Sequence, residues 1–288
     1  MTEAPHRPVM VEEVVQLLAG AEVVVDMTLG AGGHAEALLD AGVAEIVGVD
    51  RDPEALAIAT ERLRRFGDRV RVVQARFSEV DEDDVGGAAG GMLFDLGVSS
   101  MQLDDAARGF SFREDAPLDM RMAGASAGEP SAADLVNGLS ERELADVIFH
   151  YGDERRSRRI AAAIVRKRPI TTTDQLAGVV VGAVGRRPGG PHPARRTFQA
   201  LRIAVNRELE ELAASLPHAT GLLVPGGRVV VISYHSLEDG IVKRAFRDDP
   251  GFRALTKKPV VATDDEVDAN PRARSAKLRA AERIEEAA

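Results

Sequence analysis

A glycine-rich turn and a following carboxylate are the first residues whose types and spacing could do chemistry. The turn reads Gly30-Ala31-Gly32-Gly33-His34-Ala35 and follows the apolar run Val23-Val24-Val25. Glycines let a chain turn tightly and bring its backbone close to a ligand. Asp50 lies twenty residues after Gly30, where a carboxylate can accept both hydroxyls of a ribose. The pattern predicts a site for a nucleotide-type cofactor.

These residues alone leave alternatives open. The turn also satisfies the G-x-G-x-x-A fingerprint of dinucleotide sites, so a nicotinamide-dependent oxidoreductase is compatible with it. A tight strand-to-helix turn followed by a solvated aspartate is the plainest interpretation. His34 opens a predicted helix, where capping competes with ligand contact as its role.

A second acid, Asp95, distinguishes a nicotinamide-dependent oxidoreductase from a methyltransferase. The segment Phe94-Asp95-Leu96-Gly97-Val98-Ser99-Ser100 places Asp95 at the end of a fourth apolar run, at the edge of a parallel sheet where ligands bind. The segment resembles the short acid-led or Asn-led motif that holds the amine beside the methyl donor in amine methyltransferases of this architecture. A strand-terminal aspartate also commonly caps a helix or forms a turn. We interpret Asp95 as a base that takes the proton of the amine; holding the cofactor is its alternative role.

The elements that must position these residues follow from periodicity. Residues 23–100 alternate short apolar runs with helical stretches, which is typical of a parallel sheet covered by helices. Helices are expected over residues 34–41 and from Pro53 to about Phe66, and a turn over residues 225–227. The predicted strands are residues 23–27, 45–50, 70–75, 92–96 and 228–233, with Val260-Val261 as a possible last strand. The fold class is therefore α/β.

One long insertion interrupts this rhythm. After Gln102, about a hundred residues are polar or alanine-rich with helix-like patterns, broken near Gly124, Gly138 and residues 186–193. We predict a cofactor-binding domain formed by residues 1–103 and 212–288, with an inserted helical substrate-recognition domain over residues 104–211. Phe198, Leu201 and Val205 begin a stripe at helical spacing that continues to Leu212, which predicts a buried Phe198.

Charge is distributed unevenly along the chain. The net charge of −9 conceals a stretch from Arg155 to Arg207 with 13 Lys or Arg residues and one acid, so its net charge is +12 and that of the remainder is −21. An ordinary solvated helix face explains a single arginine cluster, but a block so one-sided favours a polyanionic partner. The residues predicted to bind RNA phosphates, with a steep salt dependence, are Arg155, Arg156, Arg158, Arg159, Arg186, Arg187, Arg195 and Arg196.

Composition excludes several classes of protein. The chain has 288 residues, 44% of them hydrophobic, and no cysteine, which excludes disulfides and thiolate metal sites. The six histidines show no ligand spacing, so no metal is expected. No apolar run approaches the roughly 18 residues that span a bilayer, and no signal sequence is evident. We expect a cytoplasmic protein without a membrane partner.

Several longer motifs narrow the expectation. The motifs are Asp26-Met27-Thr28-Leu29 before the glycine turn, Ser99-Ser100-Met101-Gln102-Leu103-Asp104, Arg108-Gly109-Phe110-Ser111-Phe112, Pro117-Leu118-Asp119-Met120-Arg121-Met122, residues 192–203 (HPARRTFQALRI), Ser233-Tyr234-His235-Ser236-Leu237-Glu238-Asp239, and Asn270-Pro271-Arg272-Ala273-Arg274-Ser275. In this order, over nearly the whole chain, they resemble the bacterial 16S ribosomal RNA cytosine-N4 methyltransferases, the family of ribosomal RNA small subunit methyltransferase H. Tyr234 stands where that family often has Phe, and Met101 where Pro is common.

The resemblance implies a Rossmann-like class I methyltransferase sheet that binds S-adenosyl-L-methionine, with 16S ribosomal RNA of the small ribosomal subunit as partner and a homodimer. The cofactor contacts that it implies are Gly32, Gly33, His34, Asp50, Phe77, Asp95 and Gln102, to which the turn itself adds Gly30. His235 and Ser236 follow the fifth strand and are expected to shape the base pocket, as catalytic candidates beside Asp95. A core position is equally plausible for Phe77, and a surface position is the default for a lone glutamine such as Gln102. A non-catalytic RNA-binding scaffold is a further alternative.

Overall fold

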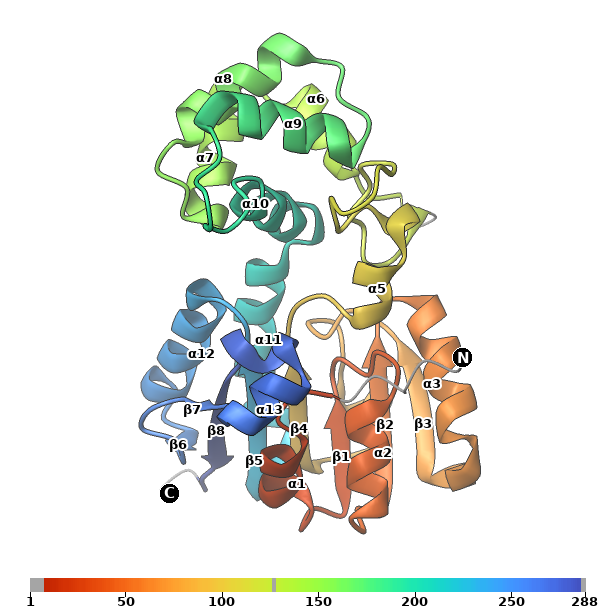
Figure 1. The fold of residues 1–288 in the computed structure, drawn as a ribbon. Helices are drawn as coiled ribbons and strands as arrows, with labels where there is room; N and C mark the ends of the chain where they lie inside the picture. The colour runs from red at the N-terminus through yellow and green to blue at the C-terminus, as the bar shows by residue number, and fades with distance from the viewer. Residues whose placement is uncertain (1–7, 126–127, 286–288) are drawn as a thin grey trace. The chain divides into compact units, whose positions relative to one another are not determined.

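The computed structural model describes residues 8–125 and 128–285, and the chain divides into two compact units (Figure 1). The first unit comprises Met1–Gly97 with Leu209–Ala288, and the second comprises Val98–Glu208. The boundaries expected from the sequence, after residue 103 and before residue 212, lie slightly further along the chain. Among the described residues, no helix is both long and apolar enough to cross a membrane.

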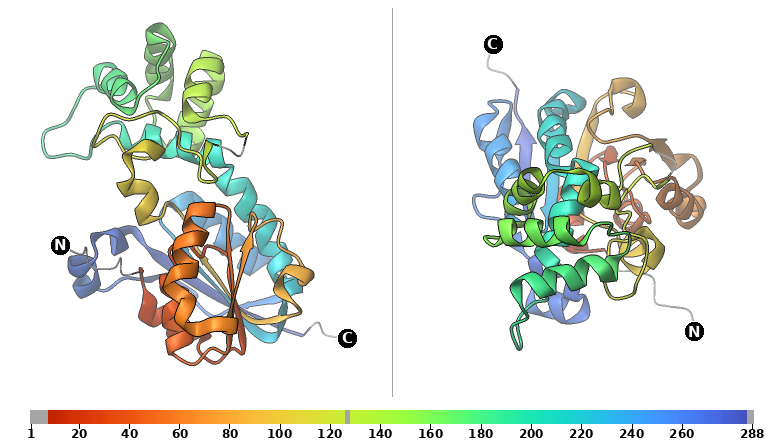
Figure 2. Two further views of the ribbon diagram at one scale, coloured as in Figure 1. Left: turned by 90° about the vertical axis from the view of Figure 1, so that its right-hand side faces the viewer. Right: turned by 90° about the horizontal axis from the view of Figure 1, so that it is seen from above.

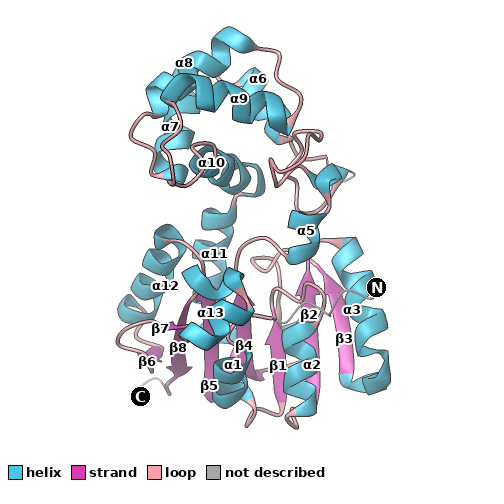
Figure 3. Ribbon diagram, in the orientation of Figure 1, coloured by secondary structure: helices cyan, strands magenta, loops and turns pink. Residues whose placement is uncertain are grey.

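A sheet of eight strands forms the centre of the first unit (Figure 3). Its strand order is β3-β2-β1-β4-β5-β8-β6, with β7 paired to β8. The strands are β1 (Val23–Asp26), β2 (Glu45–Asp50), β3 (Val70–Gln74), β4 (Ala89–Asp95), β5 (Leu223–Ser233), β6 (Phe252–Ala254), β7 (Val260–Val261) and β8 (Lys277–Arg283). Strands β3 to β5 of this order are mutually parallel, so the predicted Rossmann-like α/β fold is confirmed.

Both faces are covered at the centre of this sheet, which explains why β1, β2 and β4 are apolar without alternation. Val24 faces a cluster that includes side chains of α1 (Val11–Leu18), α2 (Gly33–Asp40) and α3 (Pro53–Leu63). Val25 faces the opposite cluster, which includes α4 (Glu82–Val85), α11 (Glu208–Leu222) and α12 (Ser236–Asp248). The layers can be followed in Figure 2. After α12 come α13 (Asp264–Ala269) and the 3-10 helix η4 (Pro271–Ser275), and η1 (Arg64–Arg69) follows α3.

Two expectations about the C-terminal strands of the sheet were wrong. The sequence indicated no strand over residues 277–283, yet β8 pairs antiparallel with β5 along its length. Most of its residues are charged or small, and strand propensity does not favour its lysine, glutamate and alanines. Arg279 is buried with its Nε 2.7 Å from Asp239 Oδ1, and this ion pair permits the burial of its charge. The turn expected over residues 225–227 is part of β5, where the pairing with β4 is irregular between Ala89 and Gly91.

Helices form the second unit, apart from an isolated bridge between Pro117 and Thr172 in its described part. They are α5 (Ser100–Asp104), η2 (Ala106–Arg108), α6 (Ala132–Gly138), α7 (Glu141–Gly152), α8 (Ser157–Lys167), α9 (Thr173–Val184) and α10 (Arg195–Asn206). Polar caps define the starts of several of them: Ser131, Ser140 and Thr172 each form a capping box with the residue three positions later.

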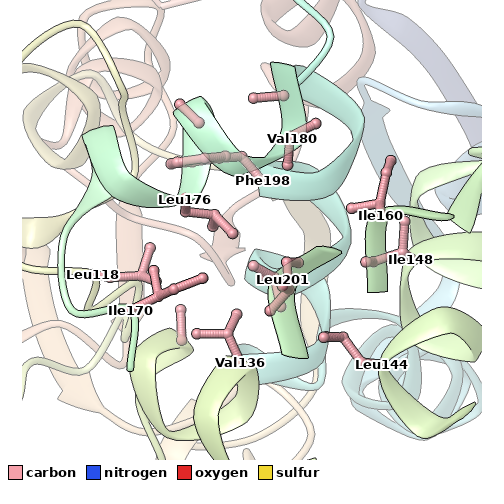
Figure 4. Close-up of a cluster of buried hydrophobic side chains, with 14 of the residues drawn as sticks. Leu118, Val136, Leu144, Ile148, Ile160, Ile170, Leu176, Val180, Phe198 and Leu201 are labelled. Carbon is pink, nitrogen blue, oxygen red and sulfur yellow. The ribbon is translucent and has the colours of Figure 1, made fainter. Parts of the chain in front are cut away.

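The second unit has its own hydrophobic core, shown in Figure 4. Phe198 on α10 is buried there with Leu176 and Leu201, so its predicted core position is confirmed. The stripe does not continue along one helix, however. Arg207 has a left-handed backbone (φ 53°) that ends α10 before α11 begins, and Leu212 belongs to the core of the first unit.

Candidate cofactor and methyl-transfer site

The carboxyl edge of the parallel sheet gathers acidic residues from three strands. Asp26 ends β1, Asp50 ends β2 and Asp95 ends β4. The strand order reverses between β1 and β4, because β1 is followed in the sheet by β2 on one side and by β4 on the other. In open α/β sheets the crevice at such a reversal is where ligands bind. The topology therefore places Asp26 and Asp95 on the two strands that flank this position.

The glycine-rich turn lies at the same edge and has the conformation that its glycines predict. Gly30 and Gly32 have φ angles of 52° and 76°, in the left-handed region that other residues rarely adopt. A Cβ atom on Gly33 would lie 2.8 Å from Pro8 Cγ, so this position has no room for a side chain. Gly33 begins α2, and the N-terminus of this helix directs unpaired backbone N–H groups toward the edge of the sheet.

Asp50 is tied to the turn by hydrogen bonds. The Gly30 N–H donates to Asp50 Oδ2 at 2.8 Å, and the Asp52 N–H donates to Asp50 Oδ1 at 2.9 Å. Burial raises the pKa of Asp50, and these two amides oppose that shift. Each carboxylate oxygen keeps a further lone pair, so Asp50 can still accept from ribose hydroxyls.

Asp95 lies beside residues that follow β1 and β5 and that begin α2. Its backbone N–H donates to Thr28 Oγ1 at 2.6 Å, which joins the end of β4 to the turn after β1. The Tyr234 hydroxyl donates to Asp95 Oδ1 at 2.7 Å, while His34 Nε2 lies 3.4 Å from Asp95 Oδ2. The hydrogen bond from Tyr234 thus orients the carboxylate, and His34 at the start of α2 lies beside its other oxygen.

Asp26 is a residue of this site that the sequence analysis did not select. It is only 1% exposed, and its Oδ1 accepts the Thr28 N–H at 3.2 Å. Its Oδ2 and both ring nitrogens of the buried His34 have no hydrogen-bond partner in the described structure. Burial raises the pKa of Asp26 from 3.8 to about 7, against the opposing effects of His34 and the Thr28 amide. The signal in the sequence was an acid ending an otherwise apolar strand.

Asp26→Asn is expected to change how stability depends on pH. The native carboxyl binds its proton up to about pH 7, whereas the unfolded one releases it near pH 3.8, so the wild-type unfolding free energy falls as the pH rises between these values. At about 1.4 kcal/mol per pKa unit, the loss amounts to about 4 kcal/mol over the whole range, of which about 3 kcal/mol falls between pH 5 and pH 8. Urea unfolding at pH 5 and pH 8 should show the variant gaining stability relative to wild type at the higher pH. The exposed Asp68→Asn serves as control, and an equal response of both variants would contradict the prediction.

His235 and Ser236 lie at the start of α12, beyond the end of β5. His235 is the N-cap of this helix: its Nδ1 accepts the Glu238 N–H at 3.4 Å, and its Nε2 lies 3.1 Å from Glu238 Oε1. Ser236 is exposed. The buried Glu238 also accepts the Tyr234 N–H at 2.8 Å, so it fixes the turn that carries the tyrosine. The structure thus gives His235 a capping role, and its catalytic role and that of Ser236 stay predictions.

The two remaining predicted cofactor contacts lie in different units. Phe77 follows β3 in the first unit, where it is half-buried with its ring 5.7 Å from that of Phe94 in an edge-on arrangement. Gln102 belongs to the second unit and is buried there. Its side-chain oxygen accepts the Ser99 N–H at 3.1 Å, which completes the cap of α5. Helix capping is therefore one role of Gln102.

The arginines predicted to bind RNA all lie in the second unit and are exposed. Two of them have structural partners: Arg156 donates to the Val184 carbonyl at 2.9 Å, and Arg196 donates to the Asp153 carbonyl at 2.7 Å. Arg155, Arg158 and Arg159 make no hydrogen bond or ion pair within residues 8–125 and 128–285. The remaining members of the set are Arg186 and Arg187, in the loop after α9, and Arg195, which begins α10.

The chemistry of the edge suits S-adenosylmethionine. The ligand offers a ribose diol, an amino group and a positive sulfonium, and the edge offers Asp50 for hydroxyls, the unsatisfied Asp26 Oδ2 for a cation and the backbone of the glycine turn. Among the residues that the structure describes, no group of three or more metal-ligating side chains is found.

The fold and site define a Rossmann-like protein that binds a nucleotide-type cofactor. The defining features are the order of the parallel strands, the glycine turn after β1 and the acids at the ends of β1, β2 and β4. Comparison with known proteins gives the particular family. The chain belongs to the MraW methylase family, whose sequence profile matches residues 3–284.

Relatives confirm the resemblance seen in the sequence motifs. The chain is similar to proteins named ribosomal RNA small subunit methyltransferase H. Identity is 53% to the protein of Sorangium cellulosum, over 97% of this chain and 91% of the relative. It is 51% to that of Geotalea uraniireducens, over 99% of this chain and 100% of the relative. Among solved structures, a putative methyltransferase from Streptococcus mutans in complex with SAH is 12% identical, with a TM-score of 0.46, over 99% of this chain and 100% of that one.

Proposed function

We propose that this protein transfers a methyl group from S-adenosylmethionine to the exocyclic N4 of a cytosine in 16S ribosomal RNA of the small ribosomal subunit. The observation that carries the proposal is the meeting of Asp26, His34 and Asp95 at the reversal of strand order, beside the glycine turn. Full-length similarity to relatives named for the methylation of small-subunit ribosomal RNA supports this choice of substrate.

When bound, S-adenosylmethionine supplies a methyl group already activated by its sulfonium charge. The residues of this chain then have to align the amine and exclude water. The glycine turn, Asp26 and Asp50 would hold the cofactor, with Phe77 and Gln102 as further predicted contacts. The lone pair of cytosine N4 is delocalised into the ring. An acceptor on its N–H group, which we assign to Asp95, favours the nucleophilic geometry and takes the released proton.

Tyr234 serves in this proposal as a positioning residue for Asp95. Burial and the adjacent Asp95 carboxylate raise the pKa of the Tyr234 hydroxyl well above its ordinary value, so the phenol stays protonated and donates its hydrogen bond at neutral pH. The negative charges of Glu238 and Glu266 shift this pKa in the same direction. The hydroxyl of Tyr234 donates to Asp95 Oδ1, so Oδ2 is the oxygen with fewer hydrogen bonds. His34 Nε2 lies 3.4 Å from this Oδ2.

Tyr234→Phe is expected to lower kcat for methyl transfer by about 10-fold or more, because a hydrogen bond to a charged group contributes about 1.5–3 kcal/mol and its loss frees the carboxylate to rotate. The dissociation constant for S-adenosylhomocysteine should stay within about twofold of wild type. Rapid-quench transfer of labelled methyl groups and calorimetry measure the two quantities. Tyr151→Phe, which removes the other tyrosine hydroxyl of the chain, is the matched control. A fall in cofactor affinity with unchanged kcat would show that Tyr234 acts on binding and not through Asp95.

Two measurements test the proposed function. Calorimetry that compares the binding of S-adenosylmethionine and of NADH distinguishes a methyltransferase from a nicotinamide oxidoreductase. Membership of a methylase family favours the methyltransferase. Transfer of radioactive methyl groups to purified small subunits, or to their RNA, separates an enzyme from a non-catalytic RNA-binding scaffold. Mass spectrometry of ribosomal RNA from cells with and without the protein then identifies the base. Binding of RNA without methyl transfer would refute the proposal.

The second unit is proposed to bind the RNA through its basic surface. The exposed arginines of α8, α10 and the loop between α9 and α10 supply the charge, so affinity should decline steeply with salt. Cytoplasmic location and the homodimer implied by the resemblance stay predictions.

A further inference from the structure

A groove in the second unit lies between two adjacent helices. α8 and α9 lie side by side (Figures 1 and 2), and the groove along them has a volume of about 710 Å³. Such a volume lies within the range of about 300–1,000 Å³ that is common for ligand sites. All of its lining residues belong to the second unit, so it can be described within that unit alone.

The charged side chains that line the groove are all positive and lie on α8. Arg159, Arg166 and Lys167 on α8 line it, and its lining includes no acidic residue. All three cationic side chains are exposed, and none makes a hydrogen bond or ion pair with the described part of the chain. Arg159 and Arg166 are two helical turns apart, which separates them by about 10 Å along the axis. Phosphates of one polyanionic strand that runs along the groove can therefore contact both side chains.

The opposite wall, formed by α9, lacks side chains at two positions because two of its residues are glycines. Gly178 and Gly182 lie one turn apart on α9 and line the groove. A Cβ atom added at either position would meet no heavy atom within 4 Å, so close packing against protein does not require these glycines. Each costs about 1 kcal/mol of helix stability relative to alanine. The bare backbone leaves open space beside Val179, an apolar surface on which a base or ribose can lie.

We infer that this groove binds a single-stranded segment of the RNA substrate, with its phosphates on Arg159, Arg166 and Lys167 and its bases or riboses over the glycine wall of α9. The inference rests on the proposed function and extends it. Within the basic cluster of residues 155–168 it assigns the contacts to Arg159, Arg166 and Lys167, and it gives the two helix glycines a role in binding.

The test uses the full-length protein and a fluorescein-labelled 12-nucleotide single-stranded RNA, titrated at several salt concentrations. We expect the triple variant Arg159→Ala/Arg166→Ala/Lys167→Ala to bind at least 10-fold more weakly at 0.15 M salt. Its plot of log affinity against log salt should be shallower by about 2, since each phosphate contact on a single strand contributes about 0.7. Arg142→Ala on α7, an exposed cation outside the groove, should bind like wild type.

A neutral change that fills the groove provides the second arm. Gly178→Gln and Gly182→Gln should each weaken RNA binding by about 5-fold or more, while thermal stability stays equal or rises because glutamine favours helix over glycine. Gly221→Gln is the control, since Gly221 is an exposed helix glycine of the first unit with the same open space.

The outcomes separate this inference from the proposed function. Wild-type affinity in the triple variant and in both glycine variants would overturn the inference, even if the protein methylates small subunits. Absence of methyl transfer by the wild-type protein would overturn the proposed function, whatever the groove binds.

Discussion

Replacing Asp95 by asparagine is expected to lower the rate of methyl transfer by about 100-fold or more, while cofactor affinity stays within about threefold of wild type. Asparagine has nearly the same shape and can still accept the Tyr234 hydroxyl bond at Oδ1. It cannot take up the proton that leaves the amine, and a positioned base contributes about 10²–10⁴-fold to such a step. Single-turnover transfer from labelled S-adenosylmethionine measures the rate, and calorimetry with S-adenosylhomocysteine measures the affinity.

The same variant distinguishes the two roles considered for Asp95. If the carboxylate only holds the cofactor, Asp95→Asn loses affinity and recovers turnover at saturating cofactor. If it is the base, affinity is kept and saturation does not restore the rate. Asp68→Asn, at an exposed position of η1, controls for the loss of one negative charge. A variant that bound cofactor normally and turned over at the wild-type rate would remove Asp95 from the proton transfer.

The parts of the fold that were predictable are those with local causes. β1, the glycine turn and β2 lie within about thirty residues. Their strands read as continuous apolar runs because both faces are buried, as Val24 and Val25 on opposite faces illustrate. The turn needs glycine where φ is positive, so Gly30 and Gly32 mark it in the sequence. Capping signals such as Ser131 and Thr172 likewise indicate helix starts without tertiary information.

The contacts that make the site are set by tertiary structure. Tyr234 and Asp95 are 139 residues apart, and only the parallel pairing of β4 with β5 brings their turns together. In the sequence, Asp26 is only the last residue of an apolar strand. Its burial, its unpartnered Oδ2 and its interaction with His34 depend on the tertiary structure. β8 was missed for a related reason: the antiparallel partner β5 and the ion pair of Arg279 with Asp239 stabilise a segment whose own composition does not favour a strand.

The motifs that carried the family resemblance also include structural residues. The Arg108 carbonyl accepts the Met120 N–H at 3.0 Å, and the guanidinium of Arg108 donates to the Met122 carbonyl at 2.7 Å. The segments Arg108–Phe112 and Pro117–Met122 therefore form one folded loop of the second unit, whose Phe110 enters its core. Some residues of these motifs therefore stabilise the fold of this loop, and their presence does not require contact with the substrate.

Gly109→Ala is expected to destabilise this loop by about 3 kcal/mol or more. Gly109 has a φ of 71°, which costs an L-residue about 1–2 kcal/mol, and the added Cβ would overlap the Pro117 carbonyl oxygen and lie 2.7 Å from the Asp119 nitrogen. Both of these atoms belong to the backbone, so relief requires the loop to move, at the 1–3 kcal/mol typical of overpacking. Native-state hydrogen exchange of the Met120 amide, which is bonded to the Arg108 carbonyl, reports the change directly.

Gly124→Ala separates the two causes of this loss. Gly124 also has a positive φ, 79°, in the same unit, but an added Cβ there would meet no heavy atom within 4 Å. It should therefore cost only the conformational part, about 1–2 kcal/mol. The difference between the two variants isolates the overlap with the Pro117–Asp119 backbone. Equal protection of the Met120 amide in both variants would mean that the loop yields at little cost, and that Gly109 is required for its backbone angle alone.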